Sequence, residues 1–86
     1  MASHIFDHQP HTIVPVIASF DSEGHIRPLY VRIKGESYKV HSSWLKPSFS
    51  MVLSFNCQVI DQGTLKPLTL EYYQRESTWI IPYKVY

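Results

Sequence analysis

Residues 24–40 read GHIRPLYVRIKGESYKV, and this stretch decides the fold. On either side of Lys34-Gly35-Glu36, apolar and polar residues alternate, as they do in a strand whose two faces differ. A glycine between two such segments supplies the positive φ that a tight turn demands. The stretch therefore predicts a strand, a tight turn and a second strand.

A related stretch, GTLKPLTLEYYQRESTWII, follows at residues 63–81. The two share the pattern Gly-x-[Ile/Leu]-[Arg/Lys]-Pro-Leu, which begins at Gly24 in the first and at Gly63 in the second. Because internal repeats fix a fold, we predict a duplication with halves at about residues 13–41 and 51–83. The two strand-turn-strand units should then be related by an approximate two-fold axis, with positive φ at both glycines. The alternative is two unrelated hairpins that each need a glycine turn.

The same alternation extends over most of the chain, and no helical period continues for three turns. We therefore predict an all-β protein. A single domain at residues 13–86 would be a small six-stranded barrel or roll of two three-strand meanders, either SH3-like or pseudo-two-fold. Residues 1–12 should form a flexible N-terminal arm, and residues 42–50 should connect the halves with at most one helical turn. The strands are predicted at residues 13–20, 26–34, 37–41, 51–60, 65–73 and 78–83.

The alternation also predicts which side chains are buried. The first strand is apolar on both faces, so we expect it to be covered on both sides. Pro15 lacks a backbone donor and should lie at an edge or a bulge. Leu29, Val31 and Ile33 should point inward from the second strand. Cys57 and Trp79 should be buried in the second half.

Length and composition limit the class of protein. The 86 residues suffice for one core. No apolar run approaches the ~20 residues of a membrane-spanning helix, and the N-terminus lacks the pattern of a signal peptide. Cys57 is the only cysteine, which excludes an intramolecular disulfide. The expected location is therefore the reducing cytoplasm, with no membrane partner.

Motifs of catalysis and metal binding are weak in this sequence. His4, His8 and His11 lie near Asp7, but an arm interrupted by proline does not bring ligands together on a stiff frame. We therefore expect no metal and no cofactor. The sequence has no nucleophile elbow, phosphate loop or paired carboxylates of a recognisable kind. We expect no enzymatic activity, and no small-molecule substrate is evident.

Charge is unevenly distributed although the net charge is only +1. Residues 24–46 contain five basic residues and one acidic residue, whereas residues 1–23 contain three acidic residues and no Lys or Arg. An outward aromatic ring among cations is typical of small barrels that stack bases and bind phosphates. Cross-strand packing of the same side chains explains the pattern equally well. The candidate binding face comprises Arg27, Tyr30, Arg32, Lys34, Lys39 and His41.

The spacing Gly-x3-Pro-x6-Gly-x2-Tyr-x-Val, carried by Gly24, Pro28, Gly35, Tyr38 and Val40, resembles a pattern in short uncharacterised bacterial β-domains. Some of these domains are associated with DNA repair or mobile elements. The resemblance implies a fold rather than an activity. Our functional prediction is a non-enzymatic binding module that contacts a protein partner or a second copy of itself. The alternative is a weak nucleic-acid-binding barrel that uses Tyr30, Arg32 and Lys39.

Overall fold

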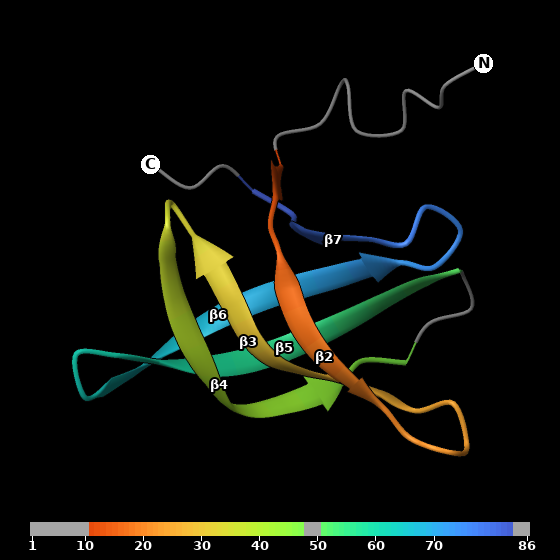
Figure 1. Ribbon diagram of the computed structural model, residues 1–86, viewed down its shortest axis with the longest axis horizontal. Helices are drawn as coiled ribbons and strands as arrows, with labels where there is room; N and C mark the ends of the chain where they lie inside the picture. The colour runs from red at the N-terminus through yellow and green to blue at the C-terminus, as the bar shows by residue number, and fades with distance from the viewer. Residues whose placement is uncertain (1–10, 48–50, 84–86) are drawn as a thin grey trace.

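The computed structural model describes residues 11–47 and 51–83, which form one antiparallel sheet of seven strands and no helix. The sheet curls into a half-barrel (Figure 1). Its strand order is β1-β7-β6-β5-β4-β3-β2. The predicted all-β class is confirmed, whereas the predicted number of six strands is wrong. The strands are β1 (Thr12–Ile13), β2 (Val16–Phe20), β3 (Ile26–Ile33), β4 (Glu36–Leu45), β5 (Val52–Asp61), β6 (Thr64–Tyr73) and β7 (Thr78–Ile81).

The seventh strand arises because the N-terminal stretch changes its partner at Val14 and Pro15. β1 pairs with β7, and β2 pairs with β3 at the other end of the strand order. The Val14 N–H donates to the Trp79 carbonyl at 3.1 Å, and the Pro15 carbonyl accepts from the Arg32 N–H at 3.0 Å. Because proline has no N–H, it interrupts a ladder at little cost where the partner changes. This stretch therefore links both ends of the sheet.

β4 is longer than predicted because it bends and pairs with two neighbours. Its first part pairs with β3 and its second part with β5. His41 is an extra residue between two successive pairs, Val40 with Val59 and Ser42 with Gln58, and such a bulge bends a strand. The bend is visible in Figure 1. Residues 42–45, predicted as a connection, thus belong to β4; residues 48–50 of that connection lie outside the described residues.

A second bulge corrects the predicted inward set of β3. Ile17 pairs with Tyr30 and Ala18 pairs with Pro28, so Leu29 has no partner on β2. The extra residue shifts the alternation by one position, and Pro28 rather than Leu29 is fully buried. Val31 is buried and Ile33 packs on the core, as predicted.

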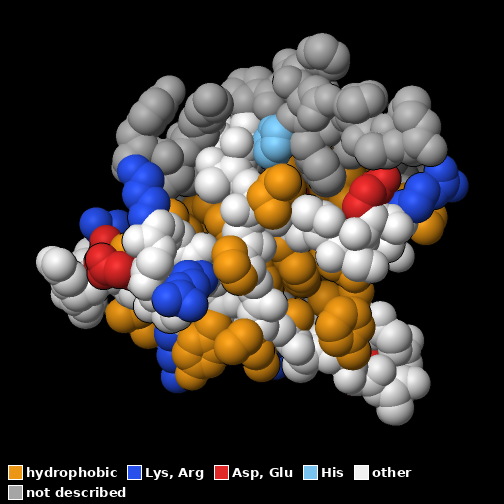
Figure 2. Space-filling view, turned by 45° about the horizontal axis from the view of Figure 1, so that its top comes forward, with side chains coloured by type: hydrophobic (Ala, Val, Ile, Leu, Met, Phe, Trp, Pro, Cys, Tyr) orange, Lys and Arg blue, Asp and Glu red, His pale blue; other side chains and the backbone are white. Residues whose placement is uncertain are grey.

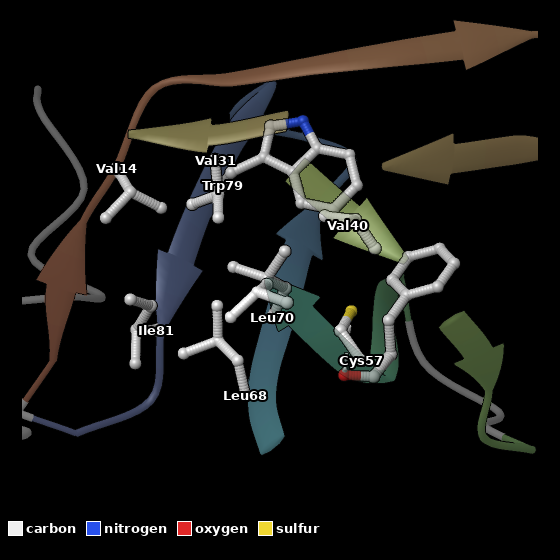
Figure 3. Close-up of a cluster of buried hydrophobic side chains, with 10 residues drawn as sticks. Val14, Val31, Val40, Cys57, Leu68, Leu70, Trp79 and Ile81 are labelled. Atoms are coloured by element: carbon white, nitrogen blue, oxygen red, sulfur yellow. Dashed lines mark hydrogen bonds between the residues drawn. The ribbon is translucent and has the colours of Figure 1, made fainter. Parts of the chain in front are cut away.

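The core lies on the concave side of the sheet. Figure 3 shows Val14, Ile81, Leu68 and Leu70 converging from the N-terminal stretch, β7 and β6. The predicted burial of Cys57 and Trp79 is confirmed. Full coverage of the first strand is not: Ile17 is 64 % exposed and Phe20 is 61 % exposed. A half-barrel covers the side of β2 on which Val16 and Ala18 pack against the core, and it leaves the side of Ile17 open. Phe20 lies on the same side as Ala18, at the last position of the strand. The buried hydrophobic side chains of the core cluster are Val14, Val31, Val40, Phe55, Cys57, Val59, Leu68, Leu70, Trp79 and Ile81.

The two proposed repeats differ in their turns. Gly24 and Gly63 both have positive φ, at 84° and 78°. The Asp61-to-Thr64 turn has two central residues, Gln62 and Gly63, and both have positive φ, as a type I′ turn requires. In the first hairpin the Asp21 N–H donates to the His25 carbonyl, which leaves Ser22, Glu23 and Gly24 as the loop. The Gly24 N–H donates to the Asp21 carbonyl, and Gly24 alone of these three is left-handed. Because the turn geometries differ, the structure provides no support for the predicted duplication.

Both predicted ends of the domain shift slightly. Thr12, assigned to the arm, belongs to β1, and its hydroxyl donates to the Tyr83 carbonyl at 3.0 Å. The last strand ends at Ile81 rather than at residue 83. The rest of the predicted arm, except for His11, lies outside the described residues.

Candidate binding face

Tyr30 lies at the centre of the convex side of the β2-β3-β4 layer. It pairs with Lys39 of β4 on one side and with Ile17 of β2 on the other. The tyrosine is 42 % exposed, and both neighbours are also exposed. Arg32 follows two positions after Tyr30, on the same side of β3, and pairs with Ser37. We call Ile17, Tyr30, Arg32, Ser37 and Lys39 the Tyr30 face.

A shallow hollow of about 180 Å³ opens on the Tyr30 face. Pro15 and Ile17 line it from β2 and the residues preceding it, and Tyr30, Arg32 and Ser37 line it from β3 and β4. The hydrogen bond between the Arg32 N–H and the Pro15 carbonyl holds its two sides together. A hollow of this size accepts a side chain rather than a substrate of several rings.

The remaining predicted residues lie beside this hollow rather than in it. Arg27 and His41 line a second hollow of about 350 Å³, together with Leu29 and Ser42. It forms where the two bulges end the pairing between β3 and β4. Lys34 lies in the β3–β4 turn with φ of 51°. The structure therefore divides the six predicted residues between two hollows, the Tyr30 face and a turn.

The cations near the Tyr30 face have no acidic partner among the described residues. None of Arg27, Arg32, Lys34 or Lys39 forms an ion pair within residues 11–47 and 51–83. Lys66 of β6 is different, because its ammonium group lies 2.9 Å from the Asp61 carboxylate. The hydrogen bond that the Lys66 ammonium donates to the Asp61 carboxylate raises the pKa of Lys66. In the part of the chain that the structure describes, the cations around Tyr30 thus have no ion-pair partner.

The acidic residues preceding β3 have a structural role. The Asp21 carboxylate accepts from the backbone N–H groups of Glu23 and His25 at 2.9 and 2.8 Å, and from the His25 ring Nδ1 at 2.9 Å. These hydrogen bonds, that from the His25 backbone above all, lower the pKa of Asp21. They fix the loop between β2 and β3.

Metal-binding groups are not assembled in the described part of the chain. Within residues 11–47 and 51–83, no three His, Cys, Asp or Glu side chains are placed to hold a metal ion. His4, Asp7 and His8 lie outside these residues, whereas His11 lies inside them.

The predicted binding face lacked two residues of the Tyr30 face, Ser37 and the exposed Ile17. Apolar residues on both sides of β2 predicted double coverage, yet Pro15 already marked this end of the strand as an edge. An edge strand covered on one side only leaves the other side chains at the surface. Figure 2 shows hydrophobic side chains at the surface in several groups among polar atoms.

Comparison with protein-family models, curated proteins and solved structures found no match to this chain. Among the described residues there is no helix long and apolar enough to cross a membrane.

Proposed function

We propose that this chain is a non-enzymatic protein-binding module, and that its contact surface is the Tyr30 face. The observation that carries the proposal is the direct pairing of two exposed side chains, Ile17 and Tyr30. Interface centres are enriched in aromatic residues and Arg, and they are depleted of Lys and acidic residues relative to the rim. Ile17, Tyr30 and Arg32 fit such a centre, and Lys39 fits its rim. The resemblance of residues 24–40 to short bacterial β-domains is consistent with a small module of this kind.

Site-specific photo-crosslinking tests the proposal. A photoreactive phenylalanine analogue at position 30 should form covalent adducts with a protein in extracts of the source cells. Leu65 on β6 provides the control position, because it is also a partly exposed hydrophobic residue but lies on another part of the sheet. We expect the yield of adducts at position 30 to exceed that at position 65 by a large factor. These adducts should be sensitive to proteases and resistant to nucleases. Equal adducts at the two positions would end the proposal.

The second candidate function is weak nucleic-acid binding by the same face. The observation that favours it is Tyr30 beside Lys39 and near Arg32, with no acidic partner for either cation among the described residues. An exposed ring stacks on bases, and unpaired cations bind phosphates. In the crosslinking experiment, nuclease-sensitive adducts at position 30 would favour this function over protein binding.

Salt dependence provides a quantitative prediction for the nucleic-acid candidate. Arg27, Arg32, Lys34 and Lys39 supply four contacts at most, so log affinity against log salt should have a slope of about −3 to −4 on duplex. Tyr30→Ala should weaken binding to single strands by about 1–3 kcal/mol if the ring stacks on a base. A fluorescence-anisotropy titration with short oligonucleotides measures both quantities.

Charge reversal supplies the control for that titration. Arg32→Glu combined with Lys39→Glu should abolish oligonucleotide binding and leave folding intact, because both side chains are exposed. Arg75→Glu changes an exposed cation in the β6–β7 turn and should leave binding nearly unchanged. The absence of binding by the folded wild-type chain at low salt would refute the nucleic-acid candidate.

A further inference from the structure

The outer edge of β2 is a second surface without a partner among the described residues. β2 stands at one end of the strand order and pairs only with β3. It forms the margin of the layer that it makes with β3 and β4 (Figure 1). An edge strand presents unpaired N–H and C=O groups, which are a template for another strand.

Two hydrogen bonds show which backbone groups of β2 face outward. The Pro15 carbonyl accepts from the Arg32 N–H, and the Asp21 N–H donates to the His25 carbonyl. Odd-numbered residues therefore face β3 at both ends of the strand, and successive residues alternate. The N–H and C=O groups of Val16, Ala18 and Phe20 consequently point away from β3.

This edge continues the one that β7 covers at Val14. The Val14 N–H donates to the Trp79 carbonyl, and within the described residues the pairing of the N-terminal stretch with β7 goes no further than this bond. A hollow of about 520 Å³ separates them, lined by residues 13–16 and 77–79. The space beside the start of β2 is therefore open to an incoming strand.

The edge of β2 also lacks the features that normally prevent pairing. Its sequence, VIASF, contains no charged residue and no proline, and Ile17 and Phe20 are largely exposed. Natural proteins protect edges with lysines, prolines or bulges that block a second strand. Here the one bulge in the β2–β3 pairing lies on β3, on the protected side.

We propose that β2 pairs with β2 of a second copy of this chain, in an antiparallel arrangement centred on Ala18. In this register Val16 lies opposite Phe20 of the other copy, and Ile17 lies opposite Ser19. The three outward-facing residues form about six backbone hydrogen bonds across the two-fold axis. The proposal goes beyond the proposed function, because it uses the backbone edge of β2 rather than the Tyr30 face.

Charge complementarity favours a second copy as the occupant. The register places Asp21 of one copy opposite Pro15 of the other, and Pro15 lies beside Arg32 on β3. The loop that carries Asp21 and Glu23 in each copy thus approaches Arg32 of the other copy, which forms no ion pair within the described residues. Because the axis is two-fold, each contact forms twice, as in isologous dimers.

Disulfide trapping tests the register. Ile17→Cys and Ser19→Cys place thiols at exposed positions, opposite each other across the two-fold axis. In the proposed register, position 17 of one copy and position 19 of the other form a non-hydrogen-bonded pair. Their Cα atoms are then about 4.5 Å apart, a separation that a disulfide can bridge. A mixture of the two variants under a mild oxidant should form a covalent dimer about tenfold faster than either variant alone. The native Cys57 is buried and should not take part.

Sedimentation velocity provides the second measurement. The full chain should show a concentration-dependent dimer that Phe20→Lys reduces to monomer, because the new charges lie on the pairing edge. Leu65→Lys also replaces an exposed hydrophobic residue and should leave the dimer intact. Ala18→Pro removes an outward-facing N–H and should also abolish the dimer.

The outcomes separate this inference from the proposed function. A monomeric wild-type chain, or a dimer whose mixed disulfide forms no faster than the unmixed ones, overturns the β2 pairing. If position 30 still crosslinks to another protein, the proposed function stands without the dimer. A β2 dimer with no crosslinks to other proteins at position 30 leaves self-association as the sole supported interaction.

Discussion

Replacing Cys57 with aspartate is expected to lower the free energy of unfolding by several kcal/mol. Cys57 is 3 % exposed and lies in the core cluster on β5. Within the described residues its thiol donates one long hydrogen bond, of 3.9 Å, to the Phe55 carbonyl. Burial raises the pKa of the thiol to about 11. A carboxylate at this site would lose its hydration without gaining a charged partner. Urea denaturation monitored by circular dichroism measures the loss.

The pH dependence of this variant provides an internal check. Desolvation raises the pKa of the introduced carboxyl in the folded state above its unfolded value. Stability relative to wild type is therefore greatest below the unfolded pKa of about 3.9 and falls as the pH rises through the folded pKa. Cys57→Ala is the control and should cost about 1 kcal/mol throughout the acidic and neutral range, in which the thiol is protonated in both the folded and the unfolded state. A destabilisation of similar size in both variants would mean that the site is not buried.

The sequence predicted those parts of the fold in which one alternation continues without interruption. In β5, Phe55, Cys57 and Val59 are all buried, and the ladder with β6 runs over the whole strand without a bulge. Two-residue period and burial therefore agree position by position. The short turns between β3 and β4 and between β5 and β6 could also be predicted from the sequence, because each contains a glycine, which permits the positive φ that the turn requires.

Bulges caused the errors within the strands. An extra residue moves every later side chain to the other face, so the period read from the sequence fails beyond it. The alternation therefore predicts Leu29 as a buried residue of β3, whereas the structure buries Pro28. It also predicts that the strand beginning at residue 37 ends at His41, whereas β4 continues to Leu45. Neither residue type is distinctive of a bulge. The local sequence thus carries no signal for the position of either.

The sequence predicted part of the candidate site but not how it is assembled. Tyr30 and Lys39 were placed outward on adjacent strands from alternation alone, and the structure pairs them. Exposure of Ile17 depends instead on where the curled sheet ends, which is a property of the whole strand order. Non-local pairing of this kind links residues far apart in the chain, such as Val14 and Trp79.

Trp79→Ala is expected to lower the free energy of unfolding by about 3–5 kcal/mol. The Trp79 side chain is 8 % exposed. The centroid of its ring lies 4.8 Å from the ring centroid of Tyr72 and 5.6 Å from that of Phe55. Such contacts add to the free energy of burial. Trp44→Ala is the matched control, because Trp44 is 58 % exposed and the same change should cost far less there. Chemical denaturation of both variants provides the comparison.

The same pair of variants separates core packing from closure of the half-barrel. The Trp79 carbonyl accepts from Val14 N–H, and alanine retains that carbonyl. If loss of the ring only removes packing, β1 should stay paired with β7. The rate of hydrogen exchange at the Val14 amide should then increase by no more than the increase that the lower global stability alone produces. If the ring also holds the N-terminal stretch in place, Val14 should exchange faster than amides of β5 and β6 in Trp79→Ala alone. Equal losses of stability in Trp79→Ala and Trp44→Ala would contradict the assignment of Trp79 to the core, since only a ring removed from water contributes its full area to folding.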